Sequence, residues 1–339
     1  MTQILGQEFG NNFSAYHGDC IEVLRGLPDN SVDFHIFSPP FASLYVFSNS
    51  DRDIGNCRTY EEFSEHYAFI SAELYRVLKP GRLMSVHCMN LPQSKQSTGN
   101  ISLKDFRGDI IRMHETDGFL YHSEVGIWKD PVNAMWRSKA IGLLHKQVAK
   151  DSAMSRMGLM DYLCTFRKPG DNPDPIEGLL EEYVGDMSNE EFVEFCRGEF
   201  RLREQKYAML DNDLGRNMDF DTFVSIMIWQ RYASPVWMDI EFGKTLQGHS
   251  AREEKDERHI APLQLQVIER AVQLWTLPGD IVLDPFGGIG STAYVALKMG
   301  RKAIMAELKA SYYGQMVKNL HMAETESSQI RLFDDEVAA

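Results

Sequence analysis

The stretch Ile281–Thr292, which reads IVLDPFGGIGST, decides the fold of this chain. Its first three residues form a short apolar run of the kind that makes a buried parallel strand. A glycine-rich turn follows from Phe286 to Gly290, and Ser291 opens an apolar helix expected to run to about Met299. Glycines let a backbone approach a ligand closely, and free N–H groups at a helix start face its polar parts. The stretch therefore predicts a nucleotide-type cradle.

The unit that follows this cradle narrows the choice of ligand. A second strand is expected from Arg301 to Ala306, ending at Glu307. An acidic residue about 20 residues after the first turn is placed to accept hydrogen bonds from ribose hydroxyls, which predicts a cofactor containing adenosine. A dinucleotide fingerprint reads G-x-G-x-x-G, whereas this turn reads F-G-G-I-G-S and lacks the last glycine. NAD is therefore disfavoured and stays an alternative.

The second informative segment is the apolar stretch Val32–Phe37 with the residues SPPF after it. The stretch predicts a short strand, and two prolines force the backbone out of the sheet in a rigid form. A plain proline turn is one interpretation. In the other, the Ser38 side chain and the Pro39 carbonyl accept hydrogen bonds from the exocyclic amine of a base, and Phe41 stacks on that base. Two acceptors would make the delocalised nitrogen more nucleophilic, and the prolines, Pro40 included, would hold the geometry.

Composition limits the classes of protein to consider. The chain has 339 residues and a formal net charge of −14, which argues against a protein that coats DNA by charge alone. We find no signal peptide and no apolar run long enough to span a membrane, and we expect a cytoplasmic protein without a metal. The five cysteines lack C-x-x-C pairing, which favours buried or free thiols. They are Cys20, Cys57, Cys88, Cys164 and Cys196.

Strand and helix signals alternate over most of the chain, which predicts a mostly parallel sheet. Capping boxes at Thr59 and at Ser102–Asp105 are expected to start two helices. Further strands are expected at Arg82–Cys88, Phe119–Trp128 and Leu159–Phe166.

The composition changes after residue 169, and the alternation stops. Helices are expected to start at Ser188 and to span Phe220–Tyr232, and the alternation resumes with a helix over Pro262–Trp275. We therefore divide the chain into a first catalytic half, an insertion, a cofactor-binding half and a loose tail. Their bounds are 1–169, 170–256, 257–326 and 327–339.

S-P-P-F after one strand and D-P-F-G-G-I-G-S-T after another resemble the β class of S-adenosylmethionine-dependent DNA amino-methyltransferases. These enzymes methylate N6 of adenine or N4 of cytosine. The resemblance covers most of the chain and implies an α/β, Rossmann-like methyltransferase fold, with helices flanking the sheet, a circularly permuted motif order and an inserted target-recognition region. We find no nuclease motif in the chain. In this respect it resembles phage or plasmid enzymes that lack a linked nuclease.

The resemblance also implies roles for individual residues. The catalytic group would be Ser38, Pro39, Pro40 and Phe41. The cofactor-binding residues would be Asp19, Asp284, Phe286, Gly288, Gly290, Ser291, Thr292 and Glu307.

Within the cofactor set, the loop residues would line the methionine and adenosyl parts, and Ser291 and Thr292 would bond the carboxylate. Glu307 would take the ribose hydroxyls. Asp19 would accept from the adenine amine, with a plain turn aspartate as the alternative. His259–Pro262 would contact the methionine end, but H-I-A-P-L-Q departs from the family's H-P-x-x-K-P, and a simple helix start is the alternative.

A basic window from residue 129 to residue 168 is the predicted DNA-binding surface. It holds eight basic and three acidic residues in an otherwise acidic chain. We interpret it as contacting phosphates beside a flipped-out base, with a solvated loop face as the alternative. The basic residues are Lys129, Arg137, Lys139, Lys146, Lys150, Arg156, Arg167 and Lys168. In the insertion, Arg201, Arg203, Lys206, Arg216 and Arg231 are candidates for sequence recognition.

Together, these inferences predict a site-specific methyltransferase that acts on double-stranded DNA and uses S-adenosylmethionine. Serine before P-P leans slightly toward cytosine N4 over adenine N6. An RNA methyltransferase on the same fold and a non-catalytic DNA-binding module are the alternatives. A homodimer and a place in restriction–modification are further expectations.

Overall fold

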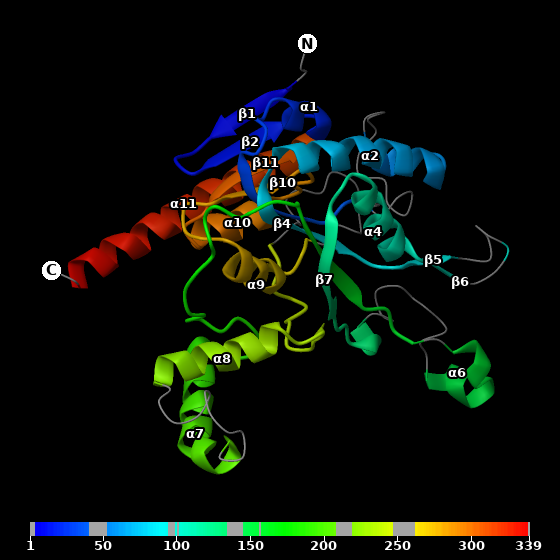
Figure 1. Ribbon diagram of the computed structural model, residues 1–339. Coiled ribbons are helices and arrows are strands. Elements are labelled where there is room, and N and C mark those ends of the chain that lie inside the picture. The colour runs from blue at the N-terminus through cyan, green and yellow to red at the C-terminus, as the bar shows by residue number, and fades with distance from the viewer. Residues whose placement is uncertain are drawn as a thin grey trace.

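The computed structural model describes residues 4–40, 53–93, 99, 102–133, 145–155, 157–207, 219–246 and 262–337. Its main sheet has nine strands in the order β1-β2-β11-β10-β3-β4-β8-β7-β9 (Figure 1). The strands are β1 (Gly6–Phe9), β2 (Phe13–His17), β3 (Val32–Phe37), β4 (Leu78–Cys88), β7 (Leu120–Ile127), β8 (Asp161–Arg167), β9 (Val236–Trp237), β10 (Ile281–Asp284) and β11 (Lys302–Glu307). A separate pair joins β5 (Leu91–Gln93) to β6 (Ser102–Lys104).

Helices cover both faces of this sheet (Figure 1). The helices packed in the two core clusters on these faces are α1 (Cys20–Arg25), α2 (Tyr60–Val77), α4 (Phe106–Thr116), α9 (Leu265–Trp275), α10 (Ser291–Lys298) and α11 (Ala310–Val337). The helices α6 (His145–Lys150), α7 (Asn189–Tyr207) and α8 (Phe220–Tyr232) complete the α-helices of the described residues. On β3, Phe34 and Ile36 pack in the core cluster that contains α9, α10 and α11. Phe37 packs in the cluster that contains α1, α2 and α4. Because neighbouring residues of a strand face opposite sides, β3 is buried on both faces.

Five neighbouring strands, β2, β11, β10, β3 and β4, run parallel. From β10 the chain passes through α10 to β11 on one side, whereas from β3 it passes through α2 to β4 on the other. The connections therefore diverge between β10 and β3. In open α/β sheets, the crevice at such a point, beyond the carboxyl ends of the strands, is where ligands bind. The α/β, mostly parallel architecture expected from the sequence is confirmed.

Two local expectations were wrong, and the strand expected over Leu159–Phe166 is present with shifted bounds. Ser102 lies in β6, and Asp105 caps α4 by accepting from the Gly108 N–H at 3.0 Å. The strand expected to start at Leu159 starts at Asp161 and runs antiparallel to both β4 and β7. The expected loose tail instead continues α11 to Val337, and the Ser327 hydroxyl donates to the Leu297 carbonyl at 3.2 Å. In Figure 1 this helix extends well beyond the sheet.

The segment 183–237, which lies in the insertion expected from the sequence, has its own small core, formed between α7 and α8 around Phe192, Cys196, Phe223 and Ile228. It also adds β9 to the edge of the main sheet, in parallel with β7. Within the described residues, no helix has both the length and the apolar character needed to cross a membrane.

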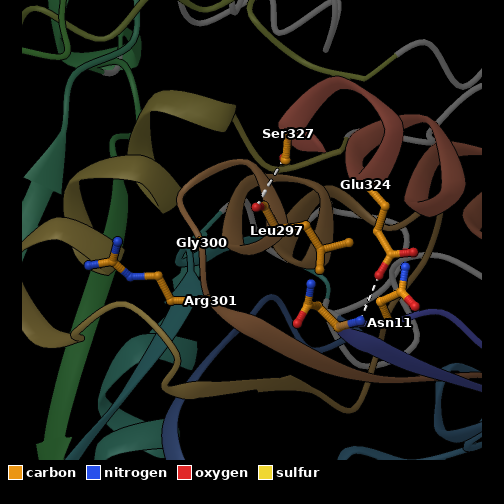
Figure 2. Close-up of a pocket in the computed structure, with 7 residues that line it drawn as sticks. Asn11, Leu297, Gly300, Arg301, Glu324 and Ser327 are labelled. Carbon is orange, nitrogen blue, oxygen red and sulfur yellow. Dashed lines mark hydrogen bonds between the residues drawn. The ribbon is translucent and has the colours of Figure 1, made fainter. Parts of the chain in front are cut away.

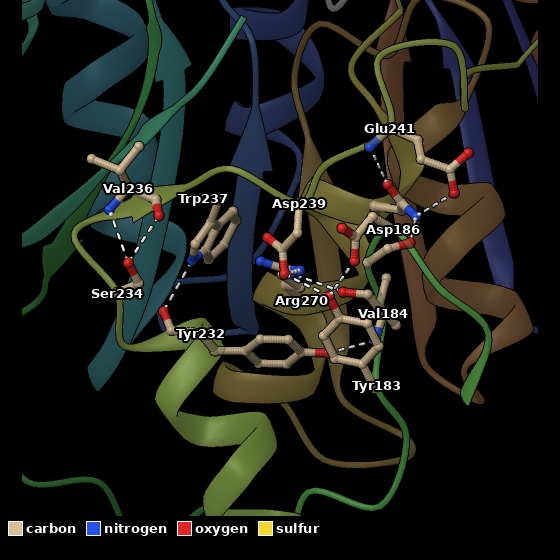
Figure 3. A network of polar contacts seen from close by, with 12 residues as sticks. Tyr183, Val184, Asp186, Tyr232, Ser234, Val236, Trp237, Asp239, Glu241 and Arg270 are labelled. Carbon is tan, nitrogen blue, oxygen red and sulfur yellow. Dashed lines mark hydrogen bonds and ion pairs between the residues drawn. The ribbon is translucent and has the colours of Figure 1, made fainter. Parts of the chain in front are cut away.

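Arg270 of α9 connects the insertion to the sheet (Figure 3). Its side chain is fully buried and pairs with Asp239 at 2.7 Å. Its Nε donates to the Val184 carbonyl at 2.8 Å, and its guanidinium lies 4.7 Å from the Tyr232 ring centroid and 5.0 Å from that of Trp237. A buried cation with these partners fixes the base of the insertion against α9.

We predict that Arg270→Met destabilises the protein by about 3–5 kcal/mol, because it leaves the largely buried Asp239 carboxylate without a counter-charge, with the hydrogen bond from Tyr183 remaining. Lys244→Met is the matched control, since Lys244 pairs with Glu241 at 2.5 Å but both side chains are half exposed. That change should cost about 0–1 kcal/mol. Urea unfolding measures both, and equal losses would contradict the role given to Arg270.

Candidate active site

The glycine turn between β10 and α10 lies directly against α11. Gly288 and Gly290 have φ angles of +53° and +91°, in the region that favours glycine. A Cβ atom on Gly287 or Gly290 would lie 3.0 Å from side-chain atoms of Met316. The Asn319 side chain donates to the Ile289 carbonyl at 2.7 Å. The backbone of the turn is therefore held from behind, with its shape set before any ligand arrives.

Glu307, at the end of β11, is bonded to this turn. One carboxylate oxygen accepts from the Gly288 N–H and the other from the Lys309 N–H, both at 2.7 Å. Burial raises the pKa of Glu307 to about 7, the two backbone N–H groups lower it, and the negative charges of Asp284 and Asp53 raise it further. The predicted acidic residue and the predicted glycine turn therefore lie side by side.

Asp284, at the end of β10, faces inward. Its carboxylate accepts from the Phe286 N–H and from the Thr292 hydroxyl, both at 2.8 Å. Burial raises the pKa of Asp284 to about 7. Thr292 is itself buried, and its hydroxyl also lies 3.3 Å from the Ile36 carbonyl. The expected contact of Thr292 with a cofactor carboxylate does not fit this position, because the hydroxyl is already committed to buried protein acceptors.

The remaining cofactor candidates lie around the same edge. Asp19 caps α1 by accepting from the Ile21 N–H at 2.9 Å, which is the structural role weighed as its alternative. Gly18 donates its N–H to the Glu307 carbonyl at 2.9 Å, so the ends of β2 and β11 are joined. Ser291 is buried in the first turn of α10. The segment His259–Ala261 lies outside the described residues.

The two sequence motifs meet at this edge. Leu283 of β10 pairs with His35 of β3, so the two strands end side by side, with Phe286 following one and Ser38 the other. The rings of Phe37 and Phe286 have centroids 5.7 Å apart. Ser38, Pro39 and Pro40 leave the sheet here as expected, and Phe41 lies outside the described residues.

Ser38 lies at one end of a series of polar contacts that sequence reasoning missed. Its Oγ is 3.1 Å from Nδ1 of His87 and 3.4 Å from the carbonyl oxygen of His87. Nε2 of His87 is 3.0 Å from Asp161, which Lys129 approaches at 2.5 Å. His87 and Asp161 are polar residues at the end of one strand and the start of another. That position was the signal available in the sequence.

The residues of the basic window lie in different environments. Lys129 is paired with Asp161, while Lys146 and Lys150 are exposed on α6. Lys168 is buried and donates to the carbonyls of Tyr75 and Leu78 at 2.7 Å, so its inclusion in a DNA-binding surface was wrong. Arg137, Lys139 and Arg156 lie outside the described residues.

The basic window nevertheless emerges beside Ser38. Since β8 is antiparallel to β4, its first residue, Asp161, lies level with the end of β4. The connection from β7 to β8 therefore leaves the sheet at the edge that carries the two motifs.

A small pocket occupies the opposite edge of the sheet, between the end of α10 and the start of β11 (Figure 2). Leu297, Gly300 and Arg301 line it together with Asn11, Asn12, Glu324 and Ser327. Neither motif contributes to it. In the described part of the chain, no group of three or more His, Cys, Asp or Glu side chains is placed to hold a metal ion, and all five cysteines are free.

A parallel sheet with a glycine turn after one strand and an acidic residue at the end of the next defines the Rossmann-like class of nucleotide-binding folds. Within that class, the chain belongs to the DNA methylase family of N6 and N4 methyltransferases, whose profile matches residues 32–318.

The chain is similar to the type II methyltransferase M.BglII of Bacillus subtilis, with 26% identity over 297 residues. That alignment covers 88% of this chain and 66% of M.BglII, so the chain spans about two thirds of that relative. Among solved structures, the cytosine-N4-specific PvuII DNA methyltransferase has a TM-score of 0.57 at 16% identity, covering 97% of this chain and 95% of that one. A putative DNA modification methylase of Thermus thermophilus has a TM-score of 0.56 at 21% identity, covering 93% and 95%. These structures share the fold.

The raised pKa of Glu307 predicts a pH-dependent stability. Between about pH 4.5 and about 7, the folded protein keeps a proton on Glu307 that the unfolded chain releases. The contribution of Glu307 to the free energy of unfolding should therefore fall as the pH rises through this window. The buried His35 and His114, whose pKa values burial lowers to about 3, contribute the opposite trend. Glu307→Gln should remove this contribution and so shift the slope toward a stability that rises with pH, and Asp284 contributes in the same sense as Glu307.

Denaturant unfolding at several pH values measures this slope. Glu61→Gln, at an exposed position of α2, is the control and should keep the full slope. A slope that is the same in all three proteins would show that Glu307 does not titrate in this way.

Proposed function

We propose that this chain transfers the methyl group of S-adenosylmethionine to an exocyclic amino group of a base flipped out of duplex DNA. The observation that carries the proposal is the meeting of two motifs from opposite halves of the chain at the carboxyl ends of β3 and β10. The hydrogen bond from Thr292 to the Ile36 carbonyl and the contact of Phe37 with Phe286 support their proximity. Membership of the DNA methylase family supports the same reaction.

The residues around the glycine turn fit this cofactor. The carboxylate of Glu307, which the Gly288 N–H holds in place, can bond a ribose, and the glycines of the turn keep that approach clear of side chains. Asp53 and Asp284 act on Glu307, and Asp19 and Glu307 both act on Cys20, so acidic side chains gather where a ligand carrying a sulfonium and an ammonium would bind. When bound, S-adenosylmethionine supplies an electrophilic methyl group. The solved Thermus methylase complexed with S-adenosylmethionine, at 20% identity, has the same fold.

The residues on the β3 side would prepare the amine. Ser38 Oγ and the Pro39 carbonyl would accept its two hydrogens and draw the nitrogen toward a nucleophilic, tetrahedral form. The two prolines limit the backbone freedom of these acceptors, which is what preorganisation requires. Phe41 would stack on the base. No covalent bond between enzyme and base is needed, and Cys88 and Cys164 are buried core residues.

The DNA would approach over the segment between β7 and β8. Lys146 and Lys150 are exposed there, and exposed apolar side chains at Trp128, Val132 and Met157 accompany them. Lysines can hold phosphates while apolar side chains fill space near an extruded base. The region 170–256 would read the sequence, with Arg201 and Arg231 exposed on α7 and α8.

Cytosine N4 is our preferred target, because a serine precedes the two prolines of the motif. Adenine N6 is the second candidate. A homodimer, a cytoplasmic location and a phage or plasmid source stay predictions from the sequence.

The purified protein should move a labelled methyl group from S-adenosylmethionine to duplex DNA and not to RNA. Nucleoside mass spectrometry of the product should find N4-methylcytosine. N6-methyladenine in the product would change only the predicted target base. Label found only in RNA would favour an RNA methyltransferase. Binding of DNA without a methylated product would favour a non-catalytic DNA-binding module.

Ser38→Ala should lower the single-turnover rate of methyl transfer roughly 100-fold, as the loss of one preorganised polar contact does in other active sites. The affinity of this variant for S-adenosylmethionine should stay unchanged, because Ser38 would contact the target base and not the cofactor. Parallel losses of rate and of affinity would count against this role.

Glu307→Ala should weaken binding of S-adenosylmethionine about 10- to 100-fold, the range for removing a hydrogen bond to a charged group. Calorimetric titration of the cofactor measures this effect, and Ser38→Ala is its matched control. An affinity equal to that of the wild type would refute the assignment of Glu307.

A further inference from the structure

Four side chains at the ends of four strands form one polar chain behind the proposed catalytic serine. Ser38 follows β3, His87 lies near the end of β4, Lys129 follows β7, and Asp161 begins β8. His87 and Asp161 are buried, and the Lys129 side chain is about one-fifth exposed. The contacts run from Ser38 to His87 at 3.1 Å, from His87 to Asp161 at 3.0 Å and from Asp161 to Lys129 at 2.5 Å.

The chemistry of these groups determines which atom donates at each contact. An ionised carboxylate only accepts hydrogen bonds, so Nε2 of His87 must be the donor toward Asp161. A neutral imidazole with its proton on Nε2 has a lone pair on Nδ1, which then accepts from the Ser38 hydroxyl. The second neighbour of that hydroxyl, the His87 carbonyl at 3.4 Å, also only accepts. The Ser38 hydrogen is therefore directed toward His87, whichever of the two atoms receives it.

We infer that Asp161 fixes His87 in its Nε2–H tautomer, and that His87 thereby turns the Ser38 hydroxyl so that its lone pairs face the target amine. This inference rests on the proposed role of Ser38. His87 and Asp161 are positioning residues, since neither needs to touch the base. With the opposite tautomer, His87 would donate to Ser38 and occupy one of the lone pairs that the amine needs.

The charge state of Asp161 supports this arrangement. Burial raises the pKa of its carboxyl, but the contacts with His87 and Lys129 outweigh burial and hold the pKa below its ordinary value. Asp161 therefore stays an acceptor throughout the neutral range. Lys129 acts here as the counter-charge of a buried carboxylate, in place of the phosphate contact expected from the sequence.

Both partners of Asp161 bond to the same oxygen, Oδ2, and Oδ1 has no hydrogen-bond partner among the described residues. An amide can reproduce this pattern, because its single oxygen can take the place of Oδ2. Asp161→Asn should therefore keep the acceptor, whereas Asp161→Leu, of similar size, removes it. The two variants form a matched pair that separates loss of the acceptor from loss of the charge.

The tautomer can be read without measuring activity. With 15N-labelled histidine in the full chain, a two-bond 1H–15N correlation spectrum separates protonated from unprotonated ring nitrogens. It would be recorded about two units above the ordinary imidazole pKa of about 6.5, and His87→Gln would assign the signals. His35 is an internal reference, because its Nε2 lies 3.1 Å from the Leu74 carbonyl, a group that can only accept.

We expect the Nε2–H form of His87 in the wild type and in Asp161→Asn, and its loss in Asp161→Leu. An Nδ1–H form in the wild type would overturn the inference even if methyl transfer is observed. Conversely, an Nε2–H form in a protein without methyltransferase activity would refute the proposed function alone.

The rate provides the second readout. Asp161→Leu should lower the single-turnover rate roughly 100-fold, while Asp161→Asn should stay near the wild type and both should bind S-adenosylmethionine normally. Equal rates in the two variants would contradict the inference. Lys129→Met controls for the disturbed ion pair and should keep the tautomer. If the leucine variant does not fold, the His87 tautomers in the wild type and in the asparagine variant still test the inference.

Discussion

The parallel pairing of β10 with β3 is the constraint on which the site depends. These strands come from opposite halves of the chain, and their adjacency brings the glycine turn and Ser38 to the same edge of the sheet. The connections through α10 and α2 then diverge, which leaves a crevice beyond the strand ends. Asp284 and Thr292 reinforce the pairing, because the Thr292 hydroxyl contacts both Asp284 of β10 and Ile36 of β3. The permuted order of the motifs is therefore irrelevant to the chemistry, since strand adjacency places them together.

Local signals predicted much of the fold. The bounds expected for Val32–Phe37 and Phe220–Tyr232 are those observed. Thr59 caps α2 through the Glu62 N–H, as its capping box predicts. The wrong expectations have non-local causes. Ser102 pairs with Gln93 in a small two-stranded sheet, and the tail stays helical where α11 packs on α10.

The site was predicted less completely, because residue type does not specify the direction of a side chain. Glu307 lies beside the glycine turn, as the spacing along a strand–turn–helix unit predicts, while its contact with a cofactor stays a prediction. Thr292 and Lys129 were assigned to a ligand and to phosphates, yet both face buried carboxylates. Their partners, Asp284 and Asp161, attract them because a buried carboxylate needs donors. Where a sequence contains both an acid and a donor, only the fold decides whether they meet.

A serine in the catalytic position raises a question that a carboxylate would not. An ionised carboxylate has only acceptor sites, so it receives the hydrogens of an amine in any orientation. A hydroxyl carries a hydrogen of its own, and in an arbitrary rotamer that hydrogen would point at the amine and repel it. A serine enzyme therefore needs an acceptor behind the hydroxyl to take its hydrogen. A neutral histidine provides that acceptor only in one tautomer, and a carboxylate on its far side selects that tautomer. The polar chain from Ser38 to Lys129 has this composition and order. On this argument, the S-P-P-F motif acts together with residues of β4, β7 and β8, which lie far from it in the sequence.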